Sequence, residues 1–395
     1  MNWPTYKLGT VADFCLGKML DQKKNRGELL PYLANINVRW GEFDLTDLRE
    51  MRFEQHELER YGLRYGDIVM CEGGEPGRCA IWKEQRSAMM IQKALHRIRP
   101  HNCLQPEFLF YYFLYKGRSG HLSPLFTGST IKHLPREKLA LVEVPVPPRP
   151  VQNEIASILS AYDDLIENNR RRIALLEQTA RLLYREWFVC FRFPGHEHIK
   201  IIDGVPEGWE RKTLGDLCFE VREVVAPNAI EANTPYIGLE HMPRRSITLS
   251  EWGQAEQVTS AKHRFREGEI LFGKIRPYFH KVGIALTDGI ASSDAIIIRP
   301  IHSRFLSFVL MATSSDGFVA TTAQQMKEGS KMPRADWKQM QEYSIPLPPD
   351  SVLHAFNDFV NPVLNQLKTL AFANKRLSTA RDLLLPKLMN GEVAV

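Results

Sequence analysis

The stretch from Val151 to Phe191 constrains this chain more than any other, because it contains no glycine or proline. Its apolar residues recur at alternating steps of four and three, which is the seam pattern of a coiled coil. A helix of this length spans roughly 55 Å at 1.5 Å per residue, more than the diameter of a small domain. We therefore expect a spacer helix whose seam carries one polar residue, Asn169; the seam is Ile155, Leu159, Tyr162, Ile166, Asn169, Ile173, Leu176, Ala180, Leu183 and Trp187.

A second seam of the same spacing lies 201 residues later. If the two helices pair antiparallel about their midpoints, facing residues have numbers that sum to 543, so Asn169 faces Asn374. Two facing amides can bond each other and penalise every register that separates them, whereas a lone buried Asn is costly. The alternative is that either Asn lies at the hydrated margin of the seam. The second seam is Phe356, Val360, Val363, Leu367, Leu370, Asn374, Leu377, Arg381, Leu384 and Leu388, so Ile155 faces Leu388 and Trp187 faces Phe356.

The second helix departs from the first near its end. Arg381 occupies a seam position, and Pro386 stands where the first copy has Arg185. Both features predict that the last turns pair weakly within the chain. This end is then either a surface for a partner or a frayed terminus.

The segments before the two helices also match in order. Framework residues recur at offsets that drift from 206 to about 200, and a collinear series of this kind indicates a duplication. We expect a first domain over 1–150, a spacer helix over 151–193, a second domain over 194–350 and a second helix over 351–395. The matches are Trp3 with Trp209, Pro31-Tyr32 with Pro235-Tyr236, Gly66-Asp67-Ile68 with Gly268-Glu269-Ile270, Arg99-Pro100 with Arg299-Pro300, Gly128-Ser129 with Gly329-Ser330, and Pro147-Pro148 with Pro348-Pro349.

Composition places the chain among globular proteins, with 44% hydrophobic and 25% charged residues. No apolar run is long enough to cross a bilayer, and the N-terminus lacks an apolar signal core, so we expect a cytoplasmic protein. The net charge of +5 is mild and decides nothing about partners. The six cysteines show no metal-binding spacing, so we interpret them as reduced thiols.

The sequence contains three short runs that resemble catalytic or cofactor-binding motifs, and each is incomplete. The run Gly268–Lys274 begins like a phosphate-binding loop, but Ile275 stands where Ser or Thr must bind Mg²⁺, and Pro277 follows. The glycines between Gly73 and Gly77 lack dinucleotide-binding spacing, and His196 and His198 have no third ligand at metal spacing. The sequence therefore predicts no active site and no metal in this chain.

Cationic and hydrogen-bonding residues gather in three pairs of loops, each pair at equivalent places in the two copies. Such loops suit contact with DNA phosphates and base edges, although scattered solvated cations are the competing interpretation. The framework repeats while the loops differ, which predicts two domains that read different halves of a split DNA site. The candidate DNA-binding residues are Asn37, Arg39, Arg78, Lys83, Thr130 and Lys132 in the first copy, and Arg244, Arg245, Lys274, Arg276, Tyr278, Lys281 and Lys331 in the second.

In this arrangement the whole chain resembles the specificity subunit of Type I restriction-modification systems. The residues that carry the resemblance are Gly204, Pro206, Gly208 and Trp209, both Gly-Asp/Glu-Ile strands, both Pro-Pro exits, and the helix end Leu182 to Glu197 (LLYREWFVCFRFPGHE). The architecture is more specific than any one of these motifs.

The resemblance implies an α+β fold of two pseudo-symmetric mixed α/β target-recognition domains, separated by two long antiparallel coiled-coil helices. It implies a non-catalytic subunit that binds bipartite double-stranded DNA and two methyltransferase subunits, joined by restriction subunits, in DNA methylation and phage defence. S-adenosylmethionine, ATP and Mg²⁺ would lie on those partners. We expect the partners on an outward helix face with Arg170, Arg171, Arg172, Glu177 and Arg181. The alternatives are a coiled-coil adaptor whose heads bind proteins, and a stand-alone enzyme.

Overall fold

The chain forms two compact units, which are described separately. A computed structural model describes residues 3–21, 23–324 and 333–393. Unit 1 comprises Met1–Leu165 with Leu377–Val395, and unit 2 comprises Ile166–Arg376. The long helices α5 (Arg149–Tyr184) and α9 (Asp350–Met389) each contribute one part to each unit. Within the described ranges, no helix combines the length and apolar character that a membrane span requires.

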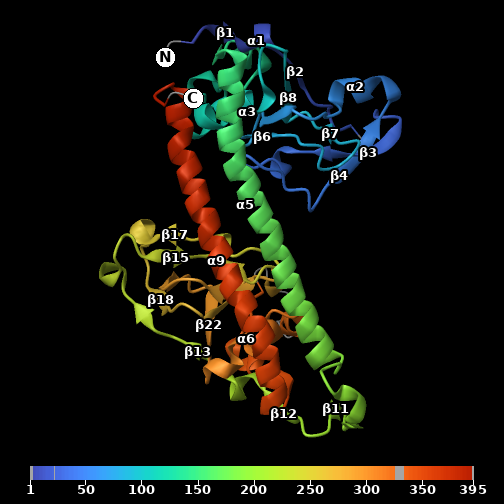
Figure 1. Ribbon diagram of the computed structural model, residues 1–395, viewed down its shortest axis with the longest axis vertical. Helices are drawn as coiled ribbons and strands as arrows, with labels where there is room; N and C mark the ends of the chain where they lie inside the picture. Colours follow the sequence, from blue (N-terminus) through green and yellow to red (C-terminus); the bar gives the residue numbers. More distant parts are fainter. Residues whose placement is uncertain (1–2, 22, 325–332, 394–395) are drawn as a thin grey trace. The chain divides into compact units, whose positions relative to one another are not determined.

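Unit 1 is built on an antiparallel four-stranded sheet in the order β2-β8-β5-β6. Its strand β5 is apolar and buried throughout, and the apolar helix α3 packs into the same core, as expected for PEFLFYYFLY. A smaller sheet has the order β4-β3-β7, and β1 pairs with β9. The elements (Figure 1) are β1 Thr5–Lys7, α1 Leu8–Val11, β2 Ala12–Leu16, β3 Glu28–Leu33, β4 Arg49–Phe53, α2 Leu58–Tyr61, β5 Ile68–Cys71, β6 Cys79–Ile81, β7 Met90–Ile91, β8 Leu95–Pro100, α3 Pro106–Arg118, α4 Arg136–Leu139 and β9 Glu143–Pro145.

Unit 2 repeats this plan with a five-stranded sheet in the order β13-β22-β19-β20-β16. A second five-stranded sheet has the order β14-β18-β21-β15-β17, while β12 pairs with β23 and β10 with β11. The elements are β10 Ile201–Ile202, β11 Val205–Pro206, β12 Glu210–Thr213, β13 Cys218–Val221, β14 Val224–Val225, β15 Pro235–Ile237, β16 Thr248–Leu249, β17 Gly253–Gln254, β18 Lys262–Phe265, β19 Ile270–Gly273, β20 Val282–Ala285, β21 Gly289–Ala291, β22 Ala295–Pro300, α6 Leu306–Thr313, α7 Asp316–Gln324, α8 Trp337–Met340 and β23 Ser344–Leu347.

Two of the repeated motifs form a single structural device. In unit 1, Arg99 donates through Nε and Nη2 to the two carboxylate oxygens of Asp67, at 2.7 Å each, and Asp67 is almost fully buried. In unit 2 the equivalent Arg299 donates to Glu269 Oε1 through Nε. The glycine before each acid has a positive φ, which favours glycine because a side chain there is strained. The Gly-Asp/Glu and Arg-Pro motifs therefore recur together because the arginine of one neutralises the buried acid of the other.

The two long helices pack antiparallel in each unit. In unit 1, Ile155 and Leu388 belong to one apolar core. In unit 2, the rings of Trp187 and Phe356 lie 6.0 Å apart, and Asn169 Nδ2 donates to Asn374 Oδ1 at 2.9 Å. These are the pairs that the seam arithmetic predicts. A short π-helical turn, Arg185–Val189, follows α5.

The end of the second helix differs from the prediction. Helix α9 continues through Pro386, and Leu385, Leu388 and Met389 are buried in the core of unit 1. Arg381 is also largely buried, because it forms an ion pair with Asp163 of α5. The predicted weak pairing at this end is wrong: apolar contacts hold the last turn, and a charge partner on the facing helix accommodates the arginine.

Candidate nucleic-acid interface

The three predicted loops of unit 1 lie together at the turn that joins β5 to β6. The loop over residues 35–44 follows β3, and Gly41 N donates to Cys79 O at 2.9 Å beside the 72–78 turn. The segment 127–134 reaches the same turn, since Leu134 N donates to Glu72 O at 2.7 Å. Residues distant in sequence thus share one surface.

The equivalent loops of unit 2 also meet. The segment 239–245 contacts the 274–281 turn through a hydrogen bond of 2.9 Å from Arg245 N to His280 O. The described part of the third loop, which begins at Pro333, also contacts this turn, because Arg276 N donates to Pro333 O at 3.0 Å. Lys331, a predicted DNA contact in this loop, lies outside the described residues.

Two of the predicted DNA contacts support loops from the inside. Arg78 donates through Nη2 to Asn35 O at 2.9 Å and through Nη1 to Glu75 at 2.6 Å, and its side chain is only 15% exposed. Lys281 donates through Nζ to Leu239 O, and burial lowers its pKa. Each carbonyl begins the turn after the Pro-Tyr strand. The structure therefore does not support Arg78 and Lys281 as DNA contacts, because their polar groups bind the loop backbone.

Asn37 is a further correction of the same kind. Its side chain is buried, its Oδ1 accepts from Ala34 N at 3.0 Å, and its Nδ2 donates to the carbonyls of Asp44 and Asp47. His241 occupies the equivalent place in unit 2, where its Nδ1 accepts from Gly238 N at 3.0 Å. Both side chains cap a loop backbone rather than face solvent.

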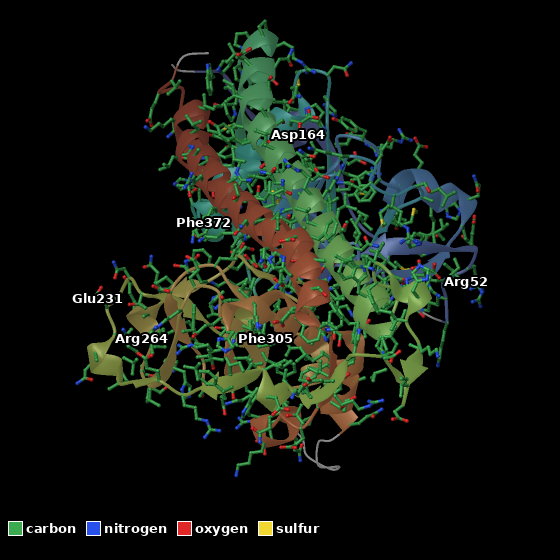
Figure 2. All side chains as sticks on the ribbon, turned by 60° about the horizontal axis from the view of Figure 1, so that its bottom comes forward. Arg52, Asp164, Glu231, Arg264, Phe305 and Phe372 are labelled. Atoms are coloured by element: carbon green, nitrogen blue, oxygen red, sulfur yellow. The ribbon has the colours of Figure 1, made fainter. Side chains whose placement is uncertain are left out.

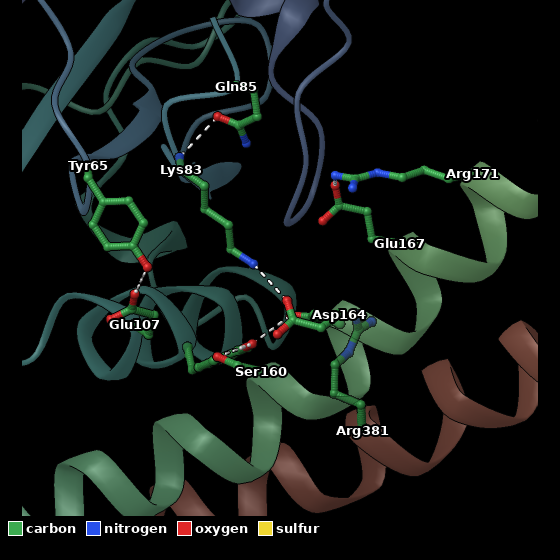
Figure 3. A network of polar contacts seen from close by, with 11 residues as sticks. Tyr65, Lys83, Gln85, Glu107, Ser160, Asp164, Glu167, Arg171 and Arg381 are labelled. Atoms are coloured by element: carbon green, nitrogen blue, oxygen red, sulfur yellow. Dashed lines mark hydrogen bonds and ion pairs between the residues drawn. The ribbon is translucent and has the colours of Figure 1, made fainter.

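Lys83 lies away from the loop cluster. It follows β6 at the end of the β5–β6 hairpin opposite the 72–78 turn, and its Nζ lies 3.1 Å from Asp164 Oδ1 on α5 (Figure 3). Lys274 is at the cluster but only partly exposed, and it donates to Ser293 O at 3.1 Å. The structure therefore does not bring Lys83 together with the other candidates.

The remaining candidates are exposed at the loops. Arg39 lies 3.5 Å from Asp44 and remains half exposed. Exposure alone does not mark an interface, since Glu231 and Arg264 of unit 2, labelled in Figure 2, are also exposed. The exposed candidates are Arg39, Thr130 and Lys132 in unit 1, and Arg244, Arg245, Arg276 and Tyr278 in unit 2.

Phe279, which is absent from the predicted contacts, organises the exposed cations of unit 2. The guanidinium of Arg244 lies 4.1 Å from the centre of its ring, and that of Arg276 lies 5.8 Å away. Tyr278 is 53% exposed beside them. The sequence signal for it is an aromatic residue between cations in KIRPYFHK (274–281). Arginines held on an aromatic face are suited to phosphate contact and to pairing with guanine.

The equivalent place in unit 1 has a different chemistry. Trp40 donates through Nε1 to Glu75 Oε1 at 2.7 Å, and the same carboxylate holds Arg78. A carboxylate at this position can accept from base amino groups but repels phosphates. The two units thus present unlike groups on like frameworks. Across the described ranges, no group of three His, Cys, Asp or Glu side chains is arranged to hold a metal ion.

The helix face predicted to receive partners is partly enclosed by unit 2. Glu177 is buried, and its Oε1 accepts from Ser246 Oγ, the backbone N–H groups of Ile247 and Thr248, and Thr248 Oγ1 at 2.6–3.1 Å. Arg181 donates to Arg245 O at 2.7 Å. The prediction that Glu177 and Arg181 face outward is wrong. Arg170, Arg171 and Arg172 are exposed.

Comparison with known proteins places these features in one family. The model of the Type I restriction modification DNA specificity domain matches residues 1–178 and 206–370. The MjaIX Type I restriction enzyme specificity subunit of Methanocaldococcus jannaschii is 24% identical, in an alignment covering 100% of this chain and 94% of that protein. The HindI specificity subunit of Haemophilus influenzae is 20% identical, covering 99% and 100%.

A solved structure shows the same fold. The crystal structure of the Type I restriction-modification S subunit from M. genitalium superposes with a TM-score of 0.58 at 16% identity, and covers 98% of this chain and 96% of that one.

Proposed function

Since the chain belongs to the family of Type I restriction-modification DNA specificity domains, we propose that it reads a bipartite DNA site with one target-recognition domain for each half. Residues 1–150 form the first of these domains and residues 194–350 the second. The chain supplies sequence recognition, and methylation and cleavage are the work of its partner subunits.

The observation that carries this proposal is the pair of loop clusters. Each cluster lies at the turn of an equivalent hairpin, β5–β6 in unit 1 and β19–β20 in unit 2, and each joins three segments distant in sequence. The supporting hydrogen bonds recur, as with Arg78 and Lys281, whereas the exposed groups differ. A common framework with unlike exposed groups suits two readers of different base sequences.

The contacts in unit 2 follow from its chemistry. Arg244 and Arg276 would bind phosphate or guanine, held in place by the ring of Phe279. Arg39 and Lys132 would supply the cations of unit 1. Helices α5 and α9 would act as the spacer and hold two methyltransferase subunits, with S-adenosylmethionine on those subunits and ATP and Mg²⁺ on restriction subunits.

A gel retardation series tests the DNA interaction. The chain with its methyltransferase partner is mixed with random duplexes over a range of salt concentrations. We expect the logarithm of the association constant to fall linearly with the logarithm of salt concentration, because phosphate contacts release counterions. Absence of salt-dependent binding would contradict the proposal and favour an adaptor whose two heads bind proteins.

A domain exchange tests the division of labour. Residues 1–148 are replaced by those of another family member, and the methylated sequence is determined by methylome sequencing. We expect one half of the recognised sequence to change and the other to persist. A change in both halves would show that the domains do not read independently.

A further inference from the structure

The apolar residues of the helix seams do not by themselves determine which helices pair. Under the offset of 201, Ile155 corresponds to Phe356 and Trp187 to Leu388, so both seams present apolar groups at the same levels. Two copies of α5, or two copies of α9, could fill these layers in the same antiparallel register. Selection of the α5–α9 pair must therefore come from other positions.

The two seam asparagines break this equivalence. Asn169 corresponds to Leu370, and Asn374 corresponds to Ile173. In the α5–α9 pair the amides bond each other at 2.9 Å. In a pair of two α5 helices, each Asn169 would face an Ile173, and in a pair of two α9 helices each Asn374 would face a Leu370. Each amide would then lose its partner, which is costly above all for the buried Asn169.

A charged pair breaks the equivalence a second time. Asp163 and Arg381 form an ion pair in unit 1, with side chains 21% and 12% exposed. Their equivalents are Leu364 and Ala180, which are both buried in the apolar core of unit 2. The same level of the repeated seam is thus filled once by apolar groups and once by opposite charges. Packing alone does not require the charges.

The charged pair is fixed by further hydrogen bonds. Tyr111 donates its hydroxyl to Asp163 Oδ2 at 2.7 Å, and Arg381 also donates to Asp382 at 2.9 Å. Figure 3 shows Arg381 directed toward the turn of α5 that carries Asp164, the neighbour of Asp163. In a pair of two α5 helices Asp163 would face Ala180. Its partly buried carboxylate would then lack the facing cation, which is unfavourable.

We propose that Asp163–Arg381 and Asn169–Asn374 together select the pairing of α5 with α9 within one chain over the pairing of like helices from two copies. Only the α5–α9 pair gives each of these four side chains a polar partner on the facing helix. The proposal is independent of what the loop clusters bind.

A variant with uniform seams tests this selection in the full chain. Asp163→Leu, Asn169→Leu, Asn374→Ile and Arg381→Ala each introduce the residue found at the equivalent position of the other helix. We expect the native chain to be monomeric by light scattering. The fourfold variant should dimerise with a dissociation constant at least about tenfold lower than that of the native chain. An unmatched buried polar group weakens dimerisation by about one order of magnitude, and the variant removes these groups.

A photo-crosslinking side chain identifies the helices that pair. With p-benzoylphenylalanine at position 176, the α5–α9 pair gives cross-links near Leu367, because 176 and 367 sum to 543. A pair of two α5 helices gives cross-links near Ile166 of the second copy instead. We expect only the first product from the native chain and both from the fourfold variant.

The matched control is Asp163→Asn with Arg381→Gln, which removes the charges but keeps polar groups facing each other. It should stay monomeric like the native chain. If the fourfold variant keeps its helical circular dichroism yet remains monomeric with cross-links only to α9, the proposal is wrong. If that variant loses its helical signal, Asn169→Leu with Asn374→Ile alone must show the same products to a smaller extent, and their absence would also overturn the proposal.

Discussion

Replacement of Glu177 should loosen unit 2 selectively. This buried carboxylate of α5 accepts four hydrogen bonds through Oε1, two of them from the backbone N–H groups of Ile247 and Thr248. Glu177→Leu leaves these two donors without that acceptor, and each unsatisfied buried donor costs about 1–3 kcal/mol. With about 1 kcal/mol regained from the apolar side chain, we expect a net loss of about 3 kcal/mol.

Glu177→Gln should reduce the stability of unit 2 by less than Glu177→Leu does. Its amide oxygen still accepts hydrogen bonds, but bonds to a charged acceptor are stronger than those to a neutral one by about 1 kcal/mol in total. Glu167→Gln is the control on the same helix, since Glu167 is half exposed and pairs with the exposed Arg171 one turn away. Such a pair contributes less than about 0.5 kcal/mol.

Amide hydrogen exchange measures these losses locally. The exchange rates of residues 246–249 report on unit 2, and those of 68–71 report on unit 1 in the same sample. We expect protection of 246–249 to fall in the order Glu167→Gln, Glu177→Gln, Glu177→Leu, with 68–71 unchanged. Equal protection in Glu177→Leu and the native chain would refute the idea that this carboxylate holds the 246–248 backbone.

Three further predictions concern DNA, the repeated framework and pH. Arg244→Ala should reduce the slope of log affinity against log salt by about 0.9, one phosphate contact, while Lys281→Met should leave that slope unchanged. Arg99→Met should lower the stability of unit 1 by about 3–5 kcal/mol in guanidinium titrations, because it leaves Asp67 buried and uncompensated. Burial lowers the pKa of His96, so the unfolded chain binds its proton at higher pH than the folded chain does. Stability of unit 1 should therefore fall as pH drops below about 6.5, and His96→Gln should reduce this dependence in denaturation measured from pH 8 to 5.

The helices and their register could be predicted because the information is periodic and local. Seam spacing identifies the buried face, and equal spacing in two seams aligns them. The asparagines at 169 and 374 then test the alignment. Arg381 could not be interpreted in the same way, since its partner Asp163 lies beside the seam of the first helix and does not occupy a seam position. A seam pattern records which positions are apolar but not which neighbouring charge reaches a polar one.

The loops could be located but their side chains could not be assigned. The sequence places cations after equivalent strands, and the loops do meet in each unit. It does not show whether a cation points outward or back to a carbonyl. Arg78 and Asn37 point back, because a loop that leaves a sheet has unpaired backbone groups and a nearby polar side chain satisfies them. The prediction that Glu177 faces outward failed for the same reason, since α5 passes the backbone N–H groups of Ile247 and Thr248, which need an acceptor.

A cation that recurs at equivalent places in the two copies therefore indicates support of the fold and not contact with DNA. Cations at equivalent places suggested contacts with DNA, yet the pair with the same chemistry, Arg78 and Lys281, supports the same carbonyl in each framework. A duplicated framework retains what it needs to fold, and a position that reads a different base in each copy must differ. The exposed groups that differ, Arg276 with Phe279 in one unit and Glu75 in the other, are where unequal recognition would arise. On this argument, exchanging the 72–78 and 274–281 turns alone should transfer part of the base preference, while exchanging Arg78 for Lys should not.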